Sequence, residues 1–180
     1  MTLIFPGSFD PVTVGHIDIA RRAAEFSSRV IVAVLDNPNK STLFSVGERV
    51  SFLKEAFGEN DGKIEVDSFS GLLVDYTVRK NADAILRGLR SSADFESENR
   101  YAASNYALSK ALYQNTDFAK IESIKIETVF IAASPELAHV SSSIIKEVAM
   151  HIYKSGLNDS FIAELVPPSV LNAIRKNFKR

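Results

Sequence analysis

Five short runs of apolar residues, many of them β-branched, recur along the sequence between longer segments of mixed polarity. They lie at residues 3–5, 30–35, 64–66, 84–86 and 129–133. Most of these runs are continuous rather than alternating, which is typical of strands that are covered on both faces of a sheet. The runs therefore predict a buried sheet, whose strands need connecting segments on both sides.

The segments between the runs have the period of amphipathic helices. Ile17, Ala20 and Ala24 fall on one helical face, and Leu53 and Phe57 lie on one face of the next segment. Helices are also predicted at about 72–79, 92–114, 142–153 and 169–178. Alternation of strand and helix is the pattern of right-handed βαβ units. We predict an α/β fold: a Rossmann-like, doubly wound, five-stranded parallel sheet with helices on both faces and further C-terminal helices.

Composition narrows the function classes. The 180 residues predict a single domain over residues 1–180. The formal charge of −1 counts against a nucleic-acid-binding module, and the absence of cysteine excludes a disulfide scaffold and a thiol nucleophile. The start of the chain has no basic residue, and its apolar run is short, so we expect neither a signal peptide nor a membrane span and predict a cytoplasmic protein.

The loop after the first predicted strand, residues 6–16, contains ligand-binding features. In an open α/β sheet, ligands bind beyond the carboxyl ends of the strands. Gly7 and Gly15 permit close approach of the backbone, Ser8 offers a hydroxyl, and His16 begins a helix whose free N–H groups favour an anion. Turn formation by Pro-Gly and Asp-Pro explains part of the same segment without a ligand.

The segment Arg87-Gly88-Leu89-Arg90 directly follows another predicted strand. Two arginines beside a glycine can hold a phosphate bidentately, although pairing with acidic residues at 94, 96 and 98 is the alternative. Glu98 and Asn105 share one face of the following helix. That face suits a ribose or a base, and a solvated face explains the spacing equally well.

Two further loops add polar groups at the same predicted sheet edge. Ser141, Ser142 and Ser143 stand at a helix start, where serines either cap the helix or bind phosphate, and Lys40 follows the second strand. No nucleophile–base pair is evident, and His16, His139 and His151 lack metal-ligand spacing. Phosphate-holding groups without a nucleophile favour direct phosphoryl or nucleotidyl transfer.

At these residues the chain resembles a known family. Thr13-x-Gly15-His16 and Val140-Ser141-Ser142-Ser143-x-x-Lys146 are similar to the two signatures of the nucleotidyltransferase α/β phosphodiesterase superfamily. More narrowly, the segments 6–11, 87–90 and 93–96 (PGSFDP, RGLR and ADFE) resemble bacterial phosphopantetheine adenylyltransferases, a likeness that extends over about residues 3–178.

The resemblance implies transfer of the adenylyl group of ATP to 4′-phosphopantetheine by direct in-line attack, giving dephospho-coenzyme A and pyrophosphate in coenzyme A biosynthesis. It implies Mg²⁺ bound with ATP, no metal site on the protein itself, and a homohexamer. His16 would be catalytic. The residues implied to bind phosphopantetheine are Ser8, Lys40, Leu73 and Arg87. Those implied to bind ATP are Ser8, Phe9, His16, Gly88, Leu89, Arg90, Glu98, Leu137, Ala138, His139, Val140, Ser141, Ser142 and Ser143.

Two features depart from that family. Leu137 stands where tryptophan is frequent, and residues 106–127 are about a dozen longer than expected, which predicts an insertion. The alternative functions are another nucleotidyltransferase of the superfamily, with nicotinate mononucleotide or glycerol phosphate as acceptor, and a non-catalytic nucleotide-binding regulator. Histidine is common at the position of Thr13 in the former, and intact His16 and Arg90 count against the latter.

Overall fold

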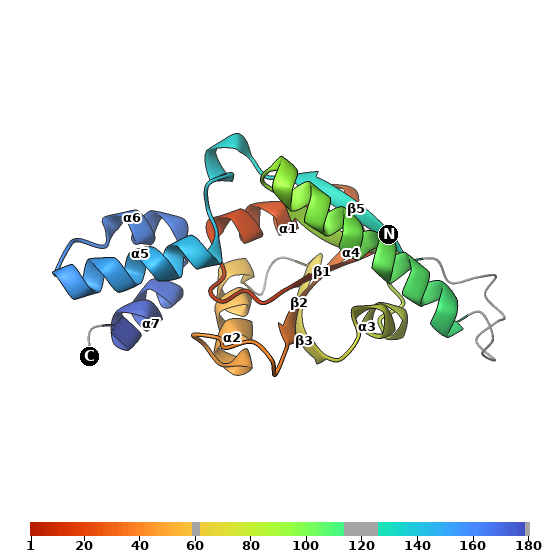
Figure 1. Cartoon of the computed structure of the whole chain (residues 1–180), viewed down its shortest axis with the longest axis horizontal. Helices are drawn as coiled ribbons and strands as arrows, with labels where there is room; N and C mark the ends of the chain where they lie inside the picture. The colour runs from red at the N-terminus through yellow and green to blue at the C-terminus, as the bar shows by residue number, and fades with distance from the viewer. Residues whose placement is uncertain (59–61, 114–125, 179–180) are drawn as a thin grey trace.

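A five-stranded parallel sheet forms the centre of the protein, as predicted (Figure 1). The computed structural model describes residues 1–58, 62–113 and 126–178. The strands are β1 (Thr2–Gly7), β2 (Arg29–Asp36), β3 (Ile64–Ser70), β4 (Ala84–Leu89) and β5 (Glu127–Ala132), in the order β3-β2-β1-β4-β5. Strand order therefore reverses between β1 and β4, where a ligand site is expected.

Two helices cover each face of this sheet. On one face α1 (Val14–Phe26) and α2 (Val46–Phe57) pack over a core that includes Leu3 and Phe5 of β1. On the other face α3 (Leu73–Arg79) packs over Ile4 and Ile85, and α4 (Ser92–Tyr113) lies beside it. Successive residues of β1 point to opposite faces, so this alternation makes the sheet doubly wound.

The two central strands separate towards their carboxyl ends. β1 pairs with β4 only at Leu3–Ala84 and Ile4–Ile85, whereas β1 and β2 stay paired as far as Gly7–Val34. Beyond Ile4 the backbone of β1 has no ladder partner on the β4 side. This divergence leaves space for a ligand at the point where strand order reverses.

The carboxyl-terminal part of the chain gathers at one end of the molecule, away from α3 (Figure 1). A short 3₁₀ helix, η2 (Pro135–Leu137), precedes α5 (Ser142–Ser155), α6 (Ser160–Leu165) and α7 (Pro168–Phe178). Helix α7 begins at Pro168, where the fixed φ of proline suits the first helical position, and it packs against α5 and α2. The sequence pattern did not predict α6 or η2.

The expected insertion at residues 106–127 lies partly outside the described residues. Its first part continues α4 to Tyr113, in agreement with the long helix predicted there, and residues 114–125 are not described. Within the described ranges, no helix combines the length and the apolar character that a bilayer span requires.

Candidate active site

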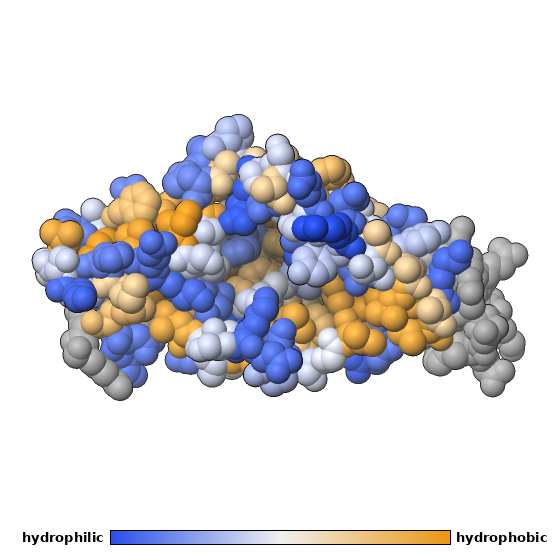
Figure 2. Space-filling view, viewed as in Figure 1, coloured by the Kyte–Doolittle hydropathy of each residue, from blue (hydrophilic) through white to orange (hydrophobic). Residues whose placement is uncertain are grey.

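A cavity of about 270 Å³ opens where β1 and β4 diverge. It lies between the carboxyl ends of these strands and the first turns of α1 and α5, and Glu98 of α4 contributes to its wall. Figure 2 shows this face of the molecule hollowed near its centre, with hydrophilic side chains around the hollow. The lining residues are Phe5, Pro6, Gly7, Phe9, Thr13, Gly15, His16, Ile19, Arg87, Gly88, Arg90, Glu98, Ala133, Leu137, Val140, Ser141, Ser142 and Ser143.

Most of the residues that the sequence singled out come together in this cavity. Three segments far apart in the chain, the β1–α1 loop, the end of β4 with the start of α4, and the start of α5, all contribute side chains. Six predicted site residues lie outside the lining: Ser8, Lys40, Leu73, Leu89, Ala138 and His139. The structure thus brings most of the predicted ATP-binding residues together, whereas three of the four predicted phosphopantetheine-binding residues do not line the cavity.

His16, the third residue of α1, is held in one tautomer. The backbone N–H of Thr13 donates to Nδ1 of His16 at 3.1 Å, and the Thr13 hydroxyl lies 2.9 Å from the same nitrogen. Because Nδ1 accepts a backbone N–H, the neutral ring carries its proton on Nε2. Burial, followed by the nearby Arg90 guanidinium, lowers the pKa of His16 to about 4. At neutral pH this residue is therefore a neutral hydrogen-bond donor.

We expect an NMR titration of the His16 imidazole to give a midpoint near 4, and Arg90→Gln to raise that midpoint by removing one of its two causes. An unfolded histidine titrates near 6.5, so the unfolded state binds more protons between pH 4 and pH 6.5. The contribution of His16 to stability therefore falls as pH decreases through that window. A midpoint near 6.5 in the folded protein would contradict this assignment.

The His16 ring packs against the aromatic ring of Phe9. Phe9 is buried, with its ring edge-to-face on Phe5 at 5.5 Å and on His16 at 5.2 Å. Its backbone has a positive φ of 48°, which turns the chain sharply towards α1. A Cβ added at Gly7 would lie 2.9 Å from Cζ of Phe9, so the close approach of this ring requires glycine.

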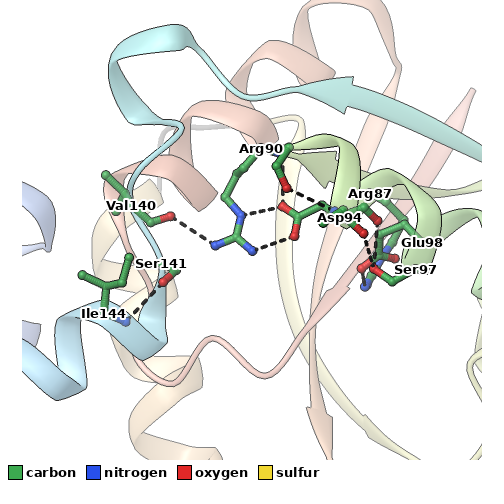
Figure 3. A network of polar contacts seen from close by, with 10 residues as sticks. Arg87, Arg90, Asp94, Ser97, Glu98, Val140, Ser141 and Ile144 are labelled. Atoms are coloured by element: carbon green, nitrogen blue, oxygen red, sulfur yellow. Dashed lines mark hydrogen bonds and ion pairs between the residues drawn. The ribbon is translucent and has the colours of Figure 1, made fainter.

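Arg87 and Glu98 form a bidentate ion pair at the cavity wall (Figure 3). Nε and Nη2 of Arg87 donate to the two carboxylate oxygens at 2.5 and 2.6 Å, and Nη1 donates to the Pro6 carbonyl at 2.9 Å. The last contact crosses the gap between the diverging β1 and β4. Arg87 is thus fixed towards the cavity, with one of the acidic partners that the sequence offered as an alternative to phosphate.

Arg90 spans the mouth of the cavity from the other side (Figure 3). It forms a bidentate pair with Asp94 at 2.9 and 3.2 Å, and Nη1 lies 3.5 Å from the Val140 carbonyl. Its side chain is 42% exposed, so the charge faces solvent and incoming ligand. Asp94 also accepts the Arg90 backbone N–H, which makes this carboxylate the support that orients the guanidinium.

The serines at the start of α5 combine capping with free donors. Ser141 is the N-cap and its hydroxyl accepts the Ile144 N–H, while the Ser142 hydroxyl donates to the Pro11 carbonyl at 2.7 Å. The Ser143 side chain is exposed. The first N–H groups of a helix have no intrahelical partner, so this end of α5 suits an anion. The capping alternative from the sequence is therefore confirmed for Ser141, and the phosphate cradle stays a prediction.

The predicted acceptor residues have varied environments. Lys40 is exposed in the β2–α2 loop, where its backbone N–H closes a turn onto the Asn37 carbonyl. Ser8 is half-buried, and its carbonyl accepts a hydrogen bond from Arg49. Leu73 begins α3 and packs against the apolar clusters on that face of the sheet. Their roles remain predictions.

The sequence reasoning did not assign Ile19 and Ala133, which complete the apolar wall. Ile19 lies one helical turn after His16, and a Cβ at Gly88 would meet its Cγ1 at 3.3 Å. The three-residue spacing from His16 was the available signal, whereas Ala133 had none. Among the described residues, no group of three metal-ligating side chains is found.

Comparison with known proteins identifies relatives along nearly the whole chain. Residues 4–148 match the family model described as cytidylyltransferase-like. The phosphopantetheine adenylyltransferase of Alkaliphilus metalliredigens is 42% identical over 173 residues, 96% of each chain. That of Desulfosudis oleivorans is 47% identical over 146 residues, 81% of this chain and 78% of the relative.

Solved structures agree on the fold. A nicotinic acid mononucleotide adenylyltransferase from Plasmodium falciparum, complexed with NaAD, superposes with a TM-score of 0.67 over 97% of this chain and 94% of its own, at 13% identity. That likeness concerns architecture alone. On the family match and the full-length relatives, this chain belongs to the cytidylyltransferase-like family and, within it, to the phosphopantetheine adenylyltransferases.

Proposed function

We propose that the protein transfers the adenylyl group of ATP to 4′-phosphopantetheine, releasing pyrophosphate and forming dephospho-coenzyme A. The observation that carries this proposal is one cavity in which His16, Arg90 and the free end of α5 converge. The names of the relatives support the same reaction. The cavity is lined by hydrogen-bond donors and cations, and groups of this kind support direct transfer between phosphates.

The lining serines favour direct attack over a covalent intermediate. The Ser142 proton is engaged by the Pro11 carbonyl, and Nδ1 of His16 is occupied by Thr13, so these two cavity residues do not form a serine–histidine pair. A phosphate oxygen of the acceptor attacks the α-phosphorus as the bond from that phosphorus to the bridging oxygen of pyrophosphate breaks. The acceptor phosphate is already ionised, so no general base is required, and the pyrophosphate leaves with the electron pair.

The residues divide between the two substrates by position. Arg90 and the first turn of α5 face each other across the cavity mouth and would hold the triphosphate. Nε2–H of His16 would donate to the α-phosphoryl oxygens, where negative charge grows in the transition state. Arg87, beside the end of β1, and Lys40 would hold the acceptor phosphate.

We further propose that Mg²⁺ enters bound to ATP. Mg²⁺ keeps several waters and takes substrate phosphates in preference to an all-protein cage, which fits a cavity rich in hydroxyls and cations. When bound, the ion neutralises charge on the triphosphate. The homohexamer implied by the resemblance and the cytoplasmic location predicted from the sequence belong to the same proposal, and light scattering measures the assembly.

Pyrophosphate release tests the function directly. The purified protein is assayed with ATP and Mg²⁺, with and without 4′-phosphopantetheine, and with nicotinate mononucleotide or glycerol 3-phosphate as competing acceptors. We expect release only with phosphopantetheine. Release with another acceptor would assign a different nucleotidyltransferase, and ATP binding without release would indicate a nucleotide-binding regulator.

A further inference from the structure

Arg49 of α2 is a buried cation with an unusual set of partners. The residue is 2% exposed, and its guanidinium donates to three backbone carbonyls. Nε contacts the Phe44 carbonyl at 3.1 Å, and Nη1 contacts the carbonyls of Ser8 and Leu35 at 2.7 and 3.3 Å. Within the described part of the chain it has no carboxylate partner. Burial of a cation without a counter-ion is costly, so these carbonyls must supply the compensation.

The three carbonyls belong to two loops at the site. Ser8 lies in the β1–α1 loop, next to the residues that line the cavity. Leu35 and Phe44 stand at the two ends of the loop that carries Lys40. One guanidinium therefore fastens both ends of the Lys40 loop to each other and to the loop after β1.

Asp10 binds the same loop through backbone N–H groups. This carboxylate is 3% exposed and accepts the backbone N–H groups of Leu43 and Phe44, each at 2.9 Å, while Lys146 of α5 contacts it at 2.8 Å. Both backbone groups of Phe44 are thus bound by buried charges of opposite sign. Its ring is buried and packs edge-to-face on Phe52 at 5.1 Å. Phe44 is a fixed anchor, and Lys40 lies four residues before it on an exposed turn.

We propose that Arg49 is a positioning residue for the acceptor substrate. By holding the carbonyls of Ser8, Leu35 and Phe44, it sets where the Lys40 ammonium stands relative to the β1–α1 loop. The planar guanidinium presents several donors in a fixed fork, which the compact ammonium of lysine does not reproduce. This inference rests on the proposed function, because it assigns the substrate that Lys40 meets.

The test is a double-mutant cycle between Arg49→Lys and Lys40→Ala. We expect Arg49→Lys to raise the KM for phosphopantetheine by about tenfold, since small displacements of a positioning group are costly, with the KM for ATP changed by less than about twofold. In the Lys40→Ala background the same substitution should have almost no further effect. Arg21→Lys is the matched control, because Arg21 is exposed and donates to a single carbonyl, that of Ala56.

Two results would overturn the proposal: equal losses for both substrates, or fully additive effects in the cycle, either of which would mean that Arg49 only supports the fold. If Arg49→Lys does not fold, Asp10→Asn weakens the same anchor. That variant should likewise raise the KM for phosphopantetheine and leave the KM for ATP nearly unchanged. Amide hydrogen exchange separates this inference from the proposed function. Arg49→Lys should accelerate exchange at Leu43 and Phe44 whatever the acceptor is, and unchanged exchange would refute the anchor.

Discussion

Replacing His16 with alanine is expected to give a folded protein that binds ATP almost normally and turns over on the order of 10²–10³-fold more slowly, as when one transition-state donor is removed. The geometry explains the size of this effect. Thr13 holds Nδ1, burial keeps the ring neutral, and Phe9 supports it, so Nε2–H is pre-oriented for charge that appears only in the transition state.

The measurement for His16→Ala combines steady-state pyrophosphate release with the dissociation constant for ATP from calorimetry. His151→Ala is the matched control, because His151 is exposed on α5 and does not line the cavity. Thermal unfolding monitors the loss of the aromatic contact with Phe9. Turnover equal to that of the unchanged protein would remove His16 from the mechanism.

Arg87→Ala is expected to raise the KM for phosphopantetheine by about 10- to 100-fold and to affect ATP much less. A hydrogen bond to a charged group is worth about 1.5–3 kcal/mol, and each 1.4 kcal/mol is about tenfold in affinity. The substitution also leaves Glu98 as an unpaired carboxylate, 17% exposed, beside the arriving phosphate. Like-charge repulsion then adds to the loss of the cation.

This second contribution can be isolated with Glu98→Gln. If the unpaired carboxylate repels the acceptor, the double variant Arg87→Ala/Glu98→Gln should bind phosphopantetheine better than Arg87→Ala alone. Initial rates at varied concentrations of each substrate provide both KM values. An effect confined to ATP would instead show that the two substrate positions have been exchanged.

The strands were the part of the fold that the sequence predicted best. All five apolar runs became strands, because a strand covered on both faces needs apolar side chains in succession. The extent of β3 was underestimated: it continues from Ile64 to Ser70 through Asp67 and Ser68. Helix α6 was missed because six residues cover too few turns to establish a period.

The sequence was sufficient to predict which loops form the site, but it did not predict the contacts between their side chains. Carboxyl ends of parallel strands meet at one sheet edge, which places His16, Arg87 and Ser141 together once the strands are known. The pairing of Arg87 with Glu98 needed side-chain geometry, since three acidic residues were available. The role of Arg49 left no trace in the pattern, because its partners are backbone carbonyls that every residue carries.

The packing of the carboxyl-terminal helices shows that the folding unit is longer than the segment matched by the family model. The family match ends at residue 148, inside α5, yet the main core continues beyond it through Ile152, Ile162, Val170 and Ile174. Helix α7 packs against α2, the helix that carries Arg49. A chain truncated at residue 148 would retain every side chain that lines the cavity. It would lose the packing of α6, α7 and the rest of α5 that supports the elements carrying those side chains.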